Sequence, residues 1–308
     1  NSAMRNTIIN EIHNAARLNK NIFFLTADLG FSVVEKFAAE LPEQFINVGI
    51  AEQNMIGVAA GLALAGKKVF VYSIIPFATM RCFEQIRIDV CYQNLDVTII
   101  GVGGGYAYGS AGSTHFALED LAIMRSLPNM KIVCPADPHE ASALGKQIID
   151  GSGPWYIRLN KGGEKIITGH TTPVIGKGSV IKPGNEATIF SIGAITVTAL
   201  EAAEILEKNN ISPEVIHIHS LKPLDKEMIA SVAGSRKAIV TLEEHTTCGG
   251  LGSAIAEIVA ESGTGVPFKM IGVNDVFLPC IGTQDYLRQK AGLSGANIVD
   301  AIKKIWKN

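Results

Sequence analysis

One glutamate stands at the start of a helix-like segment of small residues, where a carboxylate has room to act on a ligand. The segment 45–63 runs from a short strand-like stretch into this pattern, with Glu52 at the junction and Gly57, Ala60 and Gly61 following. The helix dipole favours an anion at that end, so Glu52 can simply support the first turn. A carboxylate on such an apolar helix is equally suited to proton transfer, and spacing alone leaves both interpretations open.

A second polar candidate, His115, follows a glycine-rich loop, on the side where ligands bind in open α/β sheets. The loop itself invites a dinucleotide interpretation. However, a G-x-G-x-x-G pattern that starts at Gly101 places Tyr106 at the last glycine, and no helical pattern begins there. We therefore expect a flexible loop. His217 and His219 alternate along an expected strand and are expected to be packing or surface residues.

Composition narrows the classes of partner. The chain has 27 Lys+Arg against 29 Asp+Glu and no block of like charge, which argues against nucleic acid and anionic membranes as partners. The five cysteines lie far apart without metal-ligand spacing, so we expect reduced, buried thiols and no metal site in this chain. No apolar stretch is long enough to cross a bilayer, and we expect a cytoplasmic protein.

Short β-branched stretches alternate with longer amphipathic ones along the chain. The stretches expected as strands are 22–26, 69–74, 97–101, 131–134, 155–159, 187–191, 214–219, 237–242 and 268–272. Those expected as helices are 7–16, 52–65, 82–92, 139–150, 198–209, 226–233 and 251–261. This alternation predicts an α/β fold with mostly parallel sheets, whose apolar strands are covered on both faces.

A break in the pattern falls near residues 162–184, where Gly, Thr and Pro are frequent and the helical pattern is weak. A new strand pattern starts at Ala187. We therefore expect two doubly wound domains, 1–165 and 185–308, joined by a surface linker over 166–184.

The segment Asn47-Val-Gly-Ile-Ala-Glu-Gln-Asn resembles the signature of the pyrimidine-binding domain of transketolases and deoxyxylulose-phosphate synthases. Segments 77–87, 114–120 and 128–137 follow in the order of that family, and several motifs in register are more specific than one short match. The resemblance extends over nearly the whole chain. It is closest to the separately encoded C-terminal section of split transketolases, which has a pyrimidine-binding domain followed by a C-terminal domain.

The resemblance implies a thiamine-diphosphate enzyme that transfers a two-carbon ketol unit between sugars. In the family, the carboxylate matching Glu52 bonds ring nitrogen N1′ of the aminopyrimidine, and the cofactor then carries the carbon–carbon chemistry. Phe77 matches an aromatic residue that stacks on the pyrimidine. Ile74 stands where a further aromatic residue is frequent, and Arg81 and Phe83 are expected along the same wall.

Other positions match residues of the family that face the thiazolium or the sugar. Asp28 matches an acidic residue near the thiazolium, although a turn or capping role fits it equally. His115 matches a substrate-facing histidine that helps to bind the sugar hydroxyls and transfer their protons. Arg5, Ser32 and Lys161 fall at sugar-phosphate positions, with Lys161 where arginine is usual, and lysine still binds phosphate as a point charge.

Three positions near His115 depart from the family. Gly103 replaces a histidine, Ala111 replaces an aspartate that contacts a donor hydroxyl, and Phe116 replaces a common glutamine. These changes remove polar partners for the sugar and add apolar bulk, which usually changes the preferred substrate. We therefore expect a non-standard sugar, deoxygenated or activated, rather than the ordinary pentose phosphates.

The Gly-Asp-Gly start and downstream Asn with which the family holds Mg²⁺ or Ca²⁺ against the diphosphate do not occur here in that arrangement. The resemblance thus implies a partner, the N-terminal diphosphate-binding subunit, in an α₂β₂ heterotetramer that includes self-association. This chain alone is expected to show no turnover. Three alternatives stay open: the β subunit of a 2-oxoacid dehydrogenase, a deoxyxylulose-phosphate-synthase-like enzyme, and a non-catalytic interaction subunit.

Overall fold

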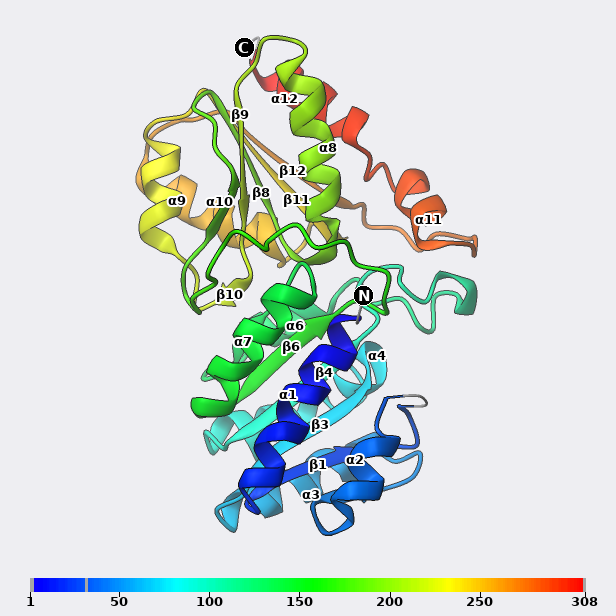
Figure 1. Ribbon diagram of the computed structural model, residues 1–308. Coiled ribbons are helices and arrows are strands. Elements are labelled where there is room, and N and C mark those ends of the chain that lie inside the picture. The colour runs from blue at the N-terminus through cyan, green and yellow to red at the C-terminus, as the bar shows by residue number, and fades with distance from the viewer. Residues whose placement is uncertain (1–2, 31–32, 307–308) are drawn as a thin grey trace.

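A seven-stranded sheet, six of whose strands lie before residue 160, forms the first domain in a computed structural model that describes residues 3–30 and 33–306 (Figure 1). In spatial order the strands are β10 (Ser220–Lys222), β5 (Lys131–Val133), β6 (Trp155–Leu159), β4 (Val97–Val102), β3 (Lys68–Ile74), β1 (Ile22–Thr26) and β2 (Phe45–Asn47). Every pairing except that of β10 with β5 is parallel. Adjacent residues of these strands face opposite sides, so helices are needed on both faces.

Two layers of helices meet that need. One layer holds α1 (Met4–Leu18), α2 (Glu35–Glu40) and α7 (Pro138–Asp150), and the other holds α3 (Glu52–Leu64), η2 (Ile86–Tyr92) and α6 (Asp120–Ser126). Helix α1 buries Met4, Ile8 and Ile12 along one stripe, as the helical period requires. Helix α7 starts where the Asp137 side chain accepts the Glu140 N–H.

The connection from β3 to β4 departs from the single helix expected over 82–92. It contains α4 (Ile75–Ala78), α5 (Phe83–Gln85) and then η2, which has π-helical hydrogen bonding. π-helical turns are rare and frequently lie at functional sites. The 3₁₀ turns are η1 (Pro42–Gln44), η3 (Gly109–Ala111) and η4 (Gly193–Ile195).

The second half builds a five-stranded sheet. Its strands, in spatial order, are β12 (Phe268–Val273), β11 (Ala238–Thr246), β8 (Ala187–Ser191), β9 (Pro213–His217) and β7 (Ser179–Lys182), of which β7 alone is antiparallel to its neighbour. One face packs against α8 (Thr196–Glu207) and α12 (Gly295–Trp306), the other against α9 (Lys226–Ala233) and α10 (Leu251–Ser262). Helix α11 (Gln284–Lys290) lies between β12 and α12 in the chain.

The two domains share more structure than the expected linker suggests. Strand β7 lies inside the range 166–184 and pairs with β9, so the second sheet begins before residue 185. Thr168 is fully buried, and its backbone N–H donates to Asp137 of the first domain. Strand β10 leaves the second domain and pairs with β5, Ser220 opposite Val133. Sequence periodicity misses β7 and β10 because each strand is short and pairs with a strand distant in the chain.

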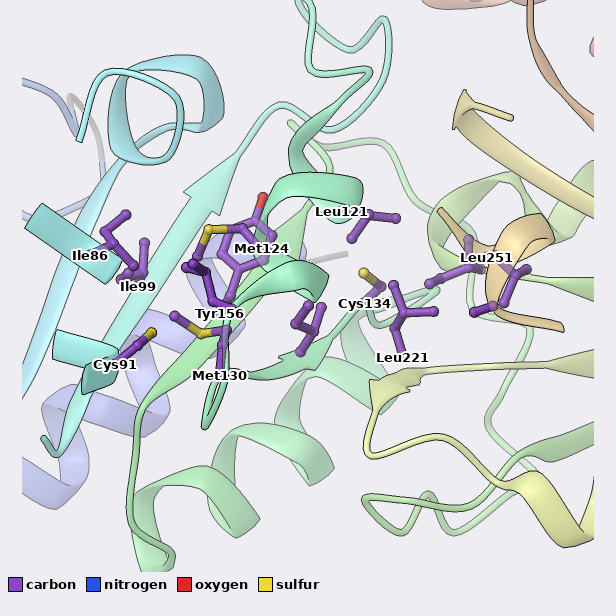
Figure 2. Close-up of a cluster of buried hydrophobic side chains, with 14 of the residues drawn as sticks. Ile86, Cys91, Ile99, Leu121, Met124, Met130, Cys134, Tyr156, Leu221 and Leu251 are labelled. Atoms are coloured by element: carbon purple, nitrogen blue, oxygen red, sulfur yellow. The ribbon is translucent and has the colours of Figure 1, made fainter. Parts of the chain in front are cut away.

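A single apolar cluster continues from the first domain into the second (Figure 2). Met124, Met130 and Cys134 lie on its first-domain side, and Leu221 and Leu251 on its second-domain side, all nearly or fully buried. All the cysteines are free, but Cys248 is exposed and Cys280 half-buried, contrary to the expectation of buried thiols throughout. Within 3–30 and 33–306, no helix combines the length and apolar character needed to cross a membrane.

Candidate active site

The candidate residues gather at one edge of the seven-stranded sheet. Asp28 follows β1, Glu52 follows β2, Phe77 follows β3, the loop with His115 follows β4, and Lys161 follows β6. These strands are parallel, so their carboxyl ends lie together, which is where ligands bind in open α/β sheets.

Glu52 is almost fully buried at the first position of α3 and is paired with Arg81. Arg81 Nη1 donates to Glu52 Oε2 over 2.7 Å, and the Gln53 side chain donates to the Arg81 carbonyl over 3.1 Å. The Glu52 side chain is 3% exposed and that of Arg81 is 45% exposed. Among the described residues, the other oxygen of Glu52, Oε1, has no hydrogen-bond partner. A buried carboxylate is thereby held in place with one acceptor oxygen left available.

Phe77 forms the wall next to this pair. The Arg81 guanidinium carbon lies 4.4 Å from the Phe77 ring centroid, and the His115 ring packs edge-on at 5.3 Å. Arg81 therefore covers one face of the Phe77 ring. Phe83 is half-buried at the start of α5 against the apolar core, and Ile74 is buried at the end of β3, so Ile74 contributes mainly packing.

Cys82 lies beside this site but is chemically quiet. Its thiol donates to the Phe77 carbonyl over 3.1 Å. Burial, reinforced by the Glu52 carboxylate, raises the pKa of Cys82 to about 12. Since the thiolate is the reactive form, Cys82 is a packing residue and not a nucleophile.

Tyr108 completes the site, although the sequence offered no signal for it beyond its place in the glycine-rich loop. Its ring centroid lies 6.2 Å from that of His115, and Lys161 Nζ lies 4.8 Å from the Tyr108 ring. A Cβ on Gly103 would stand 2.3 Å from the Tyr108 ring, so that ring occupies the space of a side chain at 103. Burial raises the pKa of Tyr108, and the nearby Arg5 guanidinium opposes this.

Arg5 reaches the same region from the first turn of α1. Burial raises the pKa of Tyr72, an effect that Arg5 partly opposes because its positive charge lies close to the phenol. Arg5 Nε is buried without a hydrogen-bond partner among the described residues. Arg5 and Lys161 thus place two cations around Tyr108. Ser32, the third expected phosphate ligand, lies outside the described residues.

Asp28 stands apart from the Glu52–Arg81 pair. It is exposed with a left-handed backbone (φ 56°), and its N–H donates to Asn47 Oδ1 over 3.0 Å. The same oxygen accepts the Gly49 N–H, so Asn47 ties the ends of β1 and β2 together. The side chain of Asp28 remains accessible at the carboxyl edge.

Phe116 corrects one expectation about the substrate pocket. It is buried in the apolar cluster of the second domain and packs edge-on against Tyr106 at 5.0 Å. Phe116 therefore adds no apolar bulk beside His115. Phe116 directly precedes Ala117, which bridges to Gly105 at the base of the loop. Ala111 is exposed in η3.

A separate buried cluster joins the domains through Glu140, His217 and His219, whose ligand-type atoms lie within 4.8 Å of one another. His217 Nε2 accepts the Gly193 N–H over 2.9 Å, so Nδ1 carries the proton and donates to Glu140. That arrangement opposes a metal on His217 Nδ1, which would require a proton on Nε2. The histidines offset the burial of Glu140 and lower its pKa. Both histidines are interdomain hydrogen-bonding residues and not surface ones.

Comparisons with known proteins place the chain. Residues 1–163 match the family model for the transketolase pyrimidine-binding domain, and residues 176–298 match that for the transketolase C-terminal domain. A putative transketolase C-terminal section of Methanocaldococcus jannaschii is 40% identical and covers 94% of this chain and 91% of that protein. A 6-deoxy-6-sulfo-D-fructose transketolase subunit of Clostridium sp. strain MSTE9 is 38% identical, covering 98% and 94%.

A solved structure described as a split-gene transketolase, inactive beta4 tetramer, is also similar. It is 39% identical with a TM-score of 0.88, and the match covers 99% of this chain and 98% of that one. Both domains, their order and their fold therefore agree with one family. The chain belongs to the transketolase family, of which it carries the pyrimidine-binding and C-terminal domains.

Proposed function

We propose that this chain is the pyrimidine-binding subunit of a split transketolase and holds the aminopyrimidine of thiamine diphosphate at Glu52. The observation that carries the proposal is the pairing of Glu52 with Arg81, which fixes a buried carboxylate and leaves Oε1 available. The half-buried ring of Phe77 beside it is an aromatic surface of the kind on which a pyrimidine stacks. These residues fit an aminopyrimidine, which needs one carboxylate oxygen and one aromatic wall.

Each residue of this chain has a distinct part. Glu52 accepts a hydrogen bond from the pyrimidine ring nitrogen and holds the proton there, Arg81 orients Glu52, and Phe77 stacks on the ring. His115 moves protons at the sugar hydroxyls. When bound, the cofactor supplies the carbanion stabilisation that carbon–carbon cleavage requires. The diphosphate and its Mg²⁺ or Ca²⁺ are bound by the partner N-terminal subunit.

The substrate site favours a ketose with an anionic end. Arg5 and Lys161 lie around Tyr108, whose ring neighbours that of His115. Lysine binds a phosphate or sulfonate as a point charge, without the planar pair of donors that an arginine offers. The name of the Clostridium relative includes a sulfonated deoxy sugar. We propose a phosphorylated or sulfonated ketose as donor. We further propose that Tyr108, whose ring fills the space over Gly103, is the residue that makes the substrate preference differ from that of transketolases acting on pentose phosphates.

The proposed assembly is an α₂β₂ heterotetramer with the diphosphate-binding subunit. The similar solved structure is described as an inactive beta4 tetramer, which supports the expectation of no turnover by this type of chain alone. The test is to purify this chain with an N-terminal transketolase subunit and to assay ketol transfer from D-fructose 6-phosphate, 6-deoxy-6-sulfo-D-fructose and D-xylulose 5-phosphate.

Turnover that needs both chains, thiamine diphosphate and Mg²⁺ supports the proposal. Robust turnover by this chain alone contradicts it. Condensation of pyruvate with glyceraldehyde 3-phosphate would indicate a deoxyxylulose-phosphate-synthase-like enzyme, and oxidation of pyruvate with an electron acceptor would indicate a 2-oxoacid dehydrogenase subunit. Failure of all three reactions in a stable complex would favour a non-catalytic subunit.

A further inference from the structure

A buried carboxylate of the second domain lies directly beneath the loop that carries Tyr108 and His115. Glu244, near the end of β11, is 4% exposed. Its Oε1 accepts the backbone N–H of Tyr106 over 2.8 Å, across the domain boundary. Its Oε2 accepts two hydrogen bonds from Arg288, at 2.9 and 2.6 Å. The Gln284 side-chain amide donates to both oxygens.

Every group around the Glu244 carboxylate is therefore a donor. A glutamine at this position has one acceptor oxygen, so its NH₂ group would have to face either the Tyr106 N–H or the Arg288 guanidinium. Both of these groups can only donate. Only a carboxylate satisfies all three partners at once.

The loop is shaped to fit this carboxylate. A Cβ on Gly105 would stand 2.4 Å from Cγ and Cδ of Glu244, so only glycine lets the backbone approach so closely. Gly105 and Ala117 exchange two hydrogen bonds at 2.9 and 3.0 Å, which close the base of the loop. Arg158 Nη2 donates to the carbonyls of both Ala117 and Glu244, at 2.8 and 3.1 Å.

A second contact holds the middle of the same loop. The Gly282 N–H of the second domain donates to the Gly109 carbonyl over 3.3 Å. A Cβ on Gly109 would stand 2.4 Å from the Gly282 carbonyl oxygen. Tyr108 and His115 thus lie on a loop whose base and middle are both held by the second domain.

We propose that Glu244 is a positioning residue for the substrate loop, so that the C-terminal domain sets the placement of Tyr108 and His115. The expected effect on donor KM rests on the proposed function, whereas the expected effect on the structure of the loop does not. It assigns the second domain a part in substrate binding, although none of its residues needs to touch the substrate.

The structural test is hydrogen–deuterium exchange of the isolated chain, which needs neither partner nor substrate. In Glu244→Gln, exchange in peptides covering residues 103–117 rises by about tenfold, because a glutamine cannot accept from the Tyr106 N–H and from Arg288 at once. Glu214→Gln is the matched control. Glu214 is a buried carboxylate of the same domain, paired with Arg236 at 3.0 Å and far along the chain from the loop. Unchanged exchange of the loop in Glu244→Gln overturns the proposal.

The kinetic test uses the reconstituted complex with whichever of D-fructose 6-phosphate and 6-deoxy-6-sulfo-D-fructose it turns over. The KM of Glu244→Gln for that donor rises by about tenfold, whereas the thiamine diphosphate concentration for half-maximal activity changes by less than about twofold. A parallel loss of cofactor affinity and thermal stability would mean a merely structural role. If the wild-type complex turns over neither donor, the proposed donor class fails, and the exchange result still decides this inference.

A second variant covers the case in which Glu244→Gln does not fold. In Gly105→Ala the new Cβ pushes the loop away from Glu244. We expect the same faster exchange of residues 103–117 and the same rise in the KM for the donor. Its control is Gly263→Ala, which has the same φ of 63° but no atom within 4 Å of the new Cβ. Any effect that both alanine variants share reports backbone strain alone and counts against the proposal.

Discussion

Replacing Glu52 with glutamine separates a catalytic carboxylate from a helix-supporting one. Glutamine keeps the shape of the side chain but removes its charge and weakens its hold on a pyrimidine proton. If Glu52 only supports the first turn of α3, the change affects stability and nothing else. If it acts on the cofactor, turnover falls by about 10²–10⁴-fold, the usual contribution of a positioned acid or base. That range corresponds to about 3–5 kcal/mol of activation free energy.

The structure predicts a small effect on folding. The Glu52 side chain is 3% exposed, so glutamine removes a charge from a buried position, while Arg81, 45% exposed, remains hydrated without its partner. For a pair with one member in solvent, the free energy of unfolding changes by less than about 1 kcal/mol. Activity and stability therefore respond to this substitution on very different scales.

The assay compares three forms of the reconstituted complex: wild type, Glu52→Gln and Glu11→Gln. Glu11 is a half-buried carboxylate of α1 that accepts a hydrogen bond from Ser142. Ketol transfer, thiamine diphosphate binding by calorimetry, and urea unfolding are measured on each. The reasoning is refuted if Glu52→Gln keeps turnover and cofactor affinity within about threefold of wild type, or if its loss of turnover follows a loss of folded protein.

Three further outcomes are expected. Lys161→Gln raises the KM for an anionic ketose by about tenfold and reduces its salt dependence, measured by steady-state kinetics at several ionic strengths. Burial lowers the pKa of His245 from 6.5 to about 4, so stability present above pH 6.5 is lost as the pH falls. Between pH 7 and pH 5 this amounts to about 2 kcal/mol, and urea unfolding of His245→Gln should lack that loss. Glu140→Gln lowers the free energy of unfolding by about 2–3 kcal/mol, because His217 and His219 lose a charged acceptor, and thermal denaturation would show it.

Much of the fold follows from periodicity in the sequence. The apolar stretches at 22–26 and 155–159 are strands with those bounds, because a buried parallel strand must be apolar on both faces. Strands β7 and β10 are three or four residues long and depend on partners distant in the chain, so no local pattern announces them. The π-helical η2 has the apolar spacing of an ordinary helix, and we have no physical account of its altered hydrogen bonding.

The site was predictable to a similar extent. Residues that follow successive parallel strands must meet at the carboxyl edge, and Glu52, Phe77 and His115 do so. The sequence does not predict which way an individual side chain of this loop points. Phe116 packs into the apolar cluster of the second domain, whereas its neighbour His115 packs against Phe77. Glu244 contacts the loop only across the domain boundary, through the Tyr106 N–H. Residue spacing within either domain gives no sign of such a contact.

We expect substrate preference in this chain to depend on how neighbouring positions share space, and not on single replacements. Gly103 lacks a side chain, yet no void results, because the ring of Tyr108 lies where that side chain would be. The phenol brings a hydroxyl and an aromatic face, against which Lys161 packs. A loss of polar groups inferred at Gly103 is thus an exchange of one polar ring for another, placed by a loop that Glu244 supports. We therefore expect Tyr108, together with the second domain that positions its loop, to determine which sugar the site prefers.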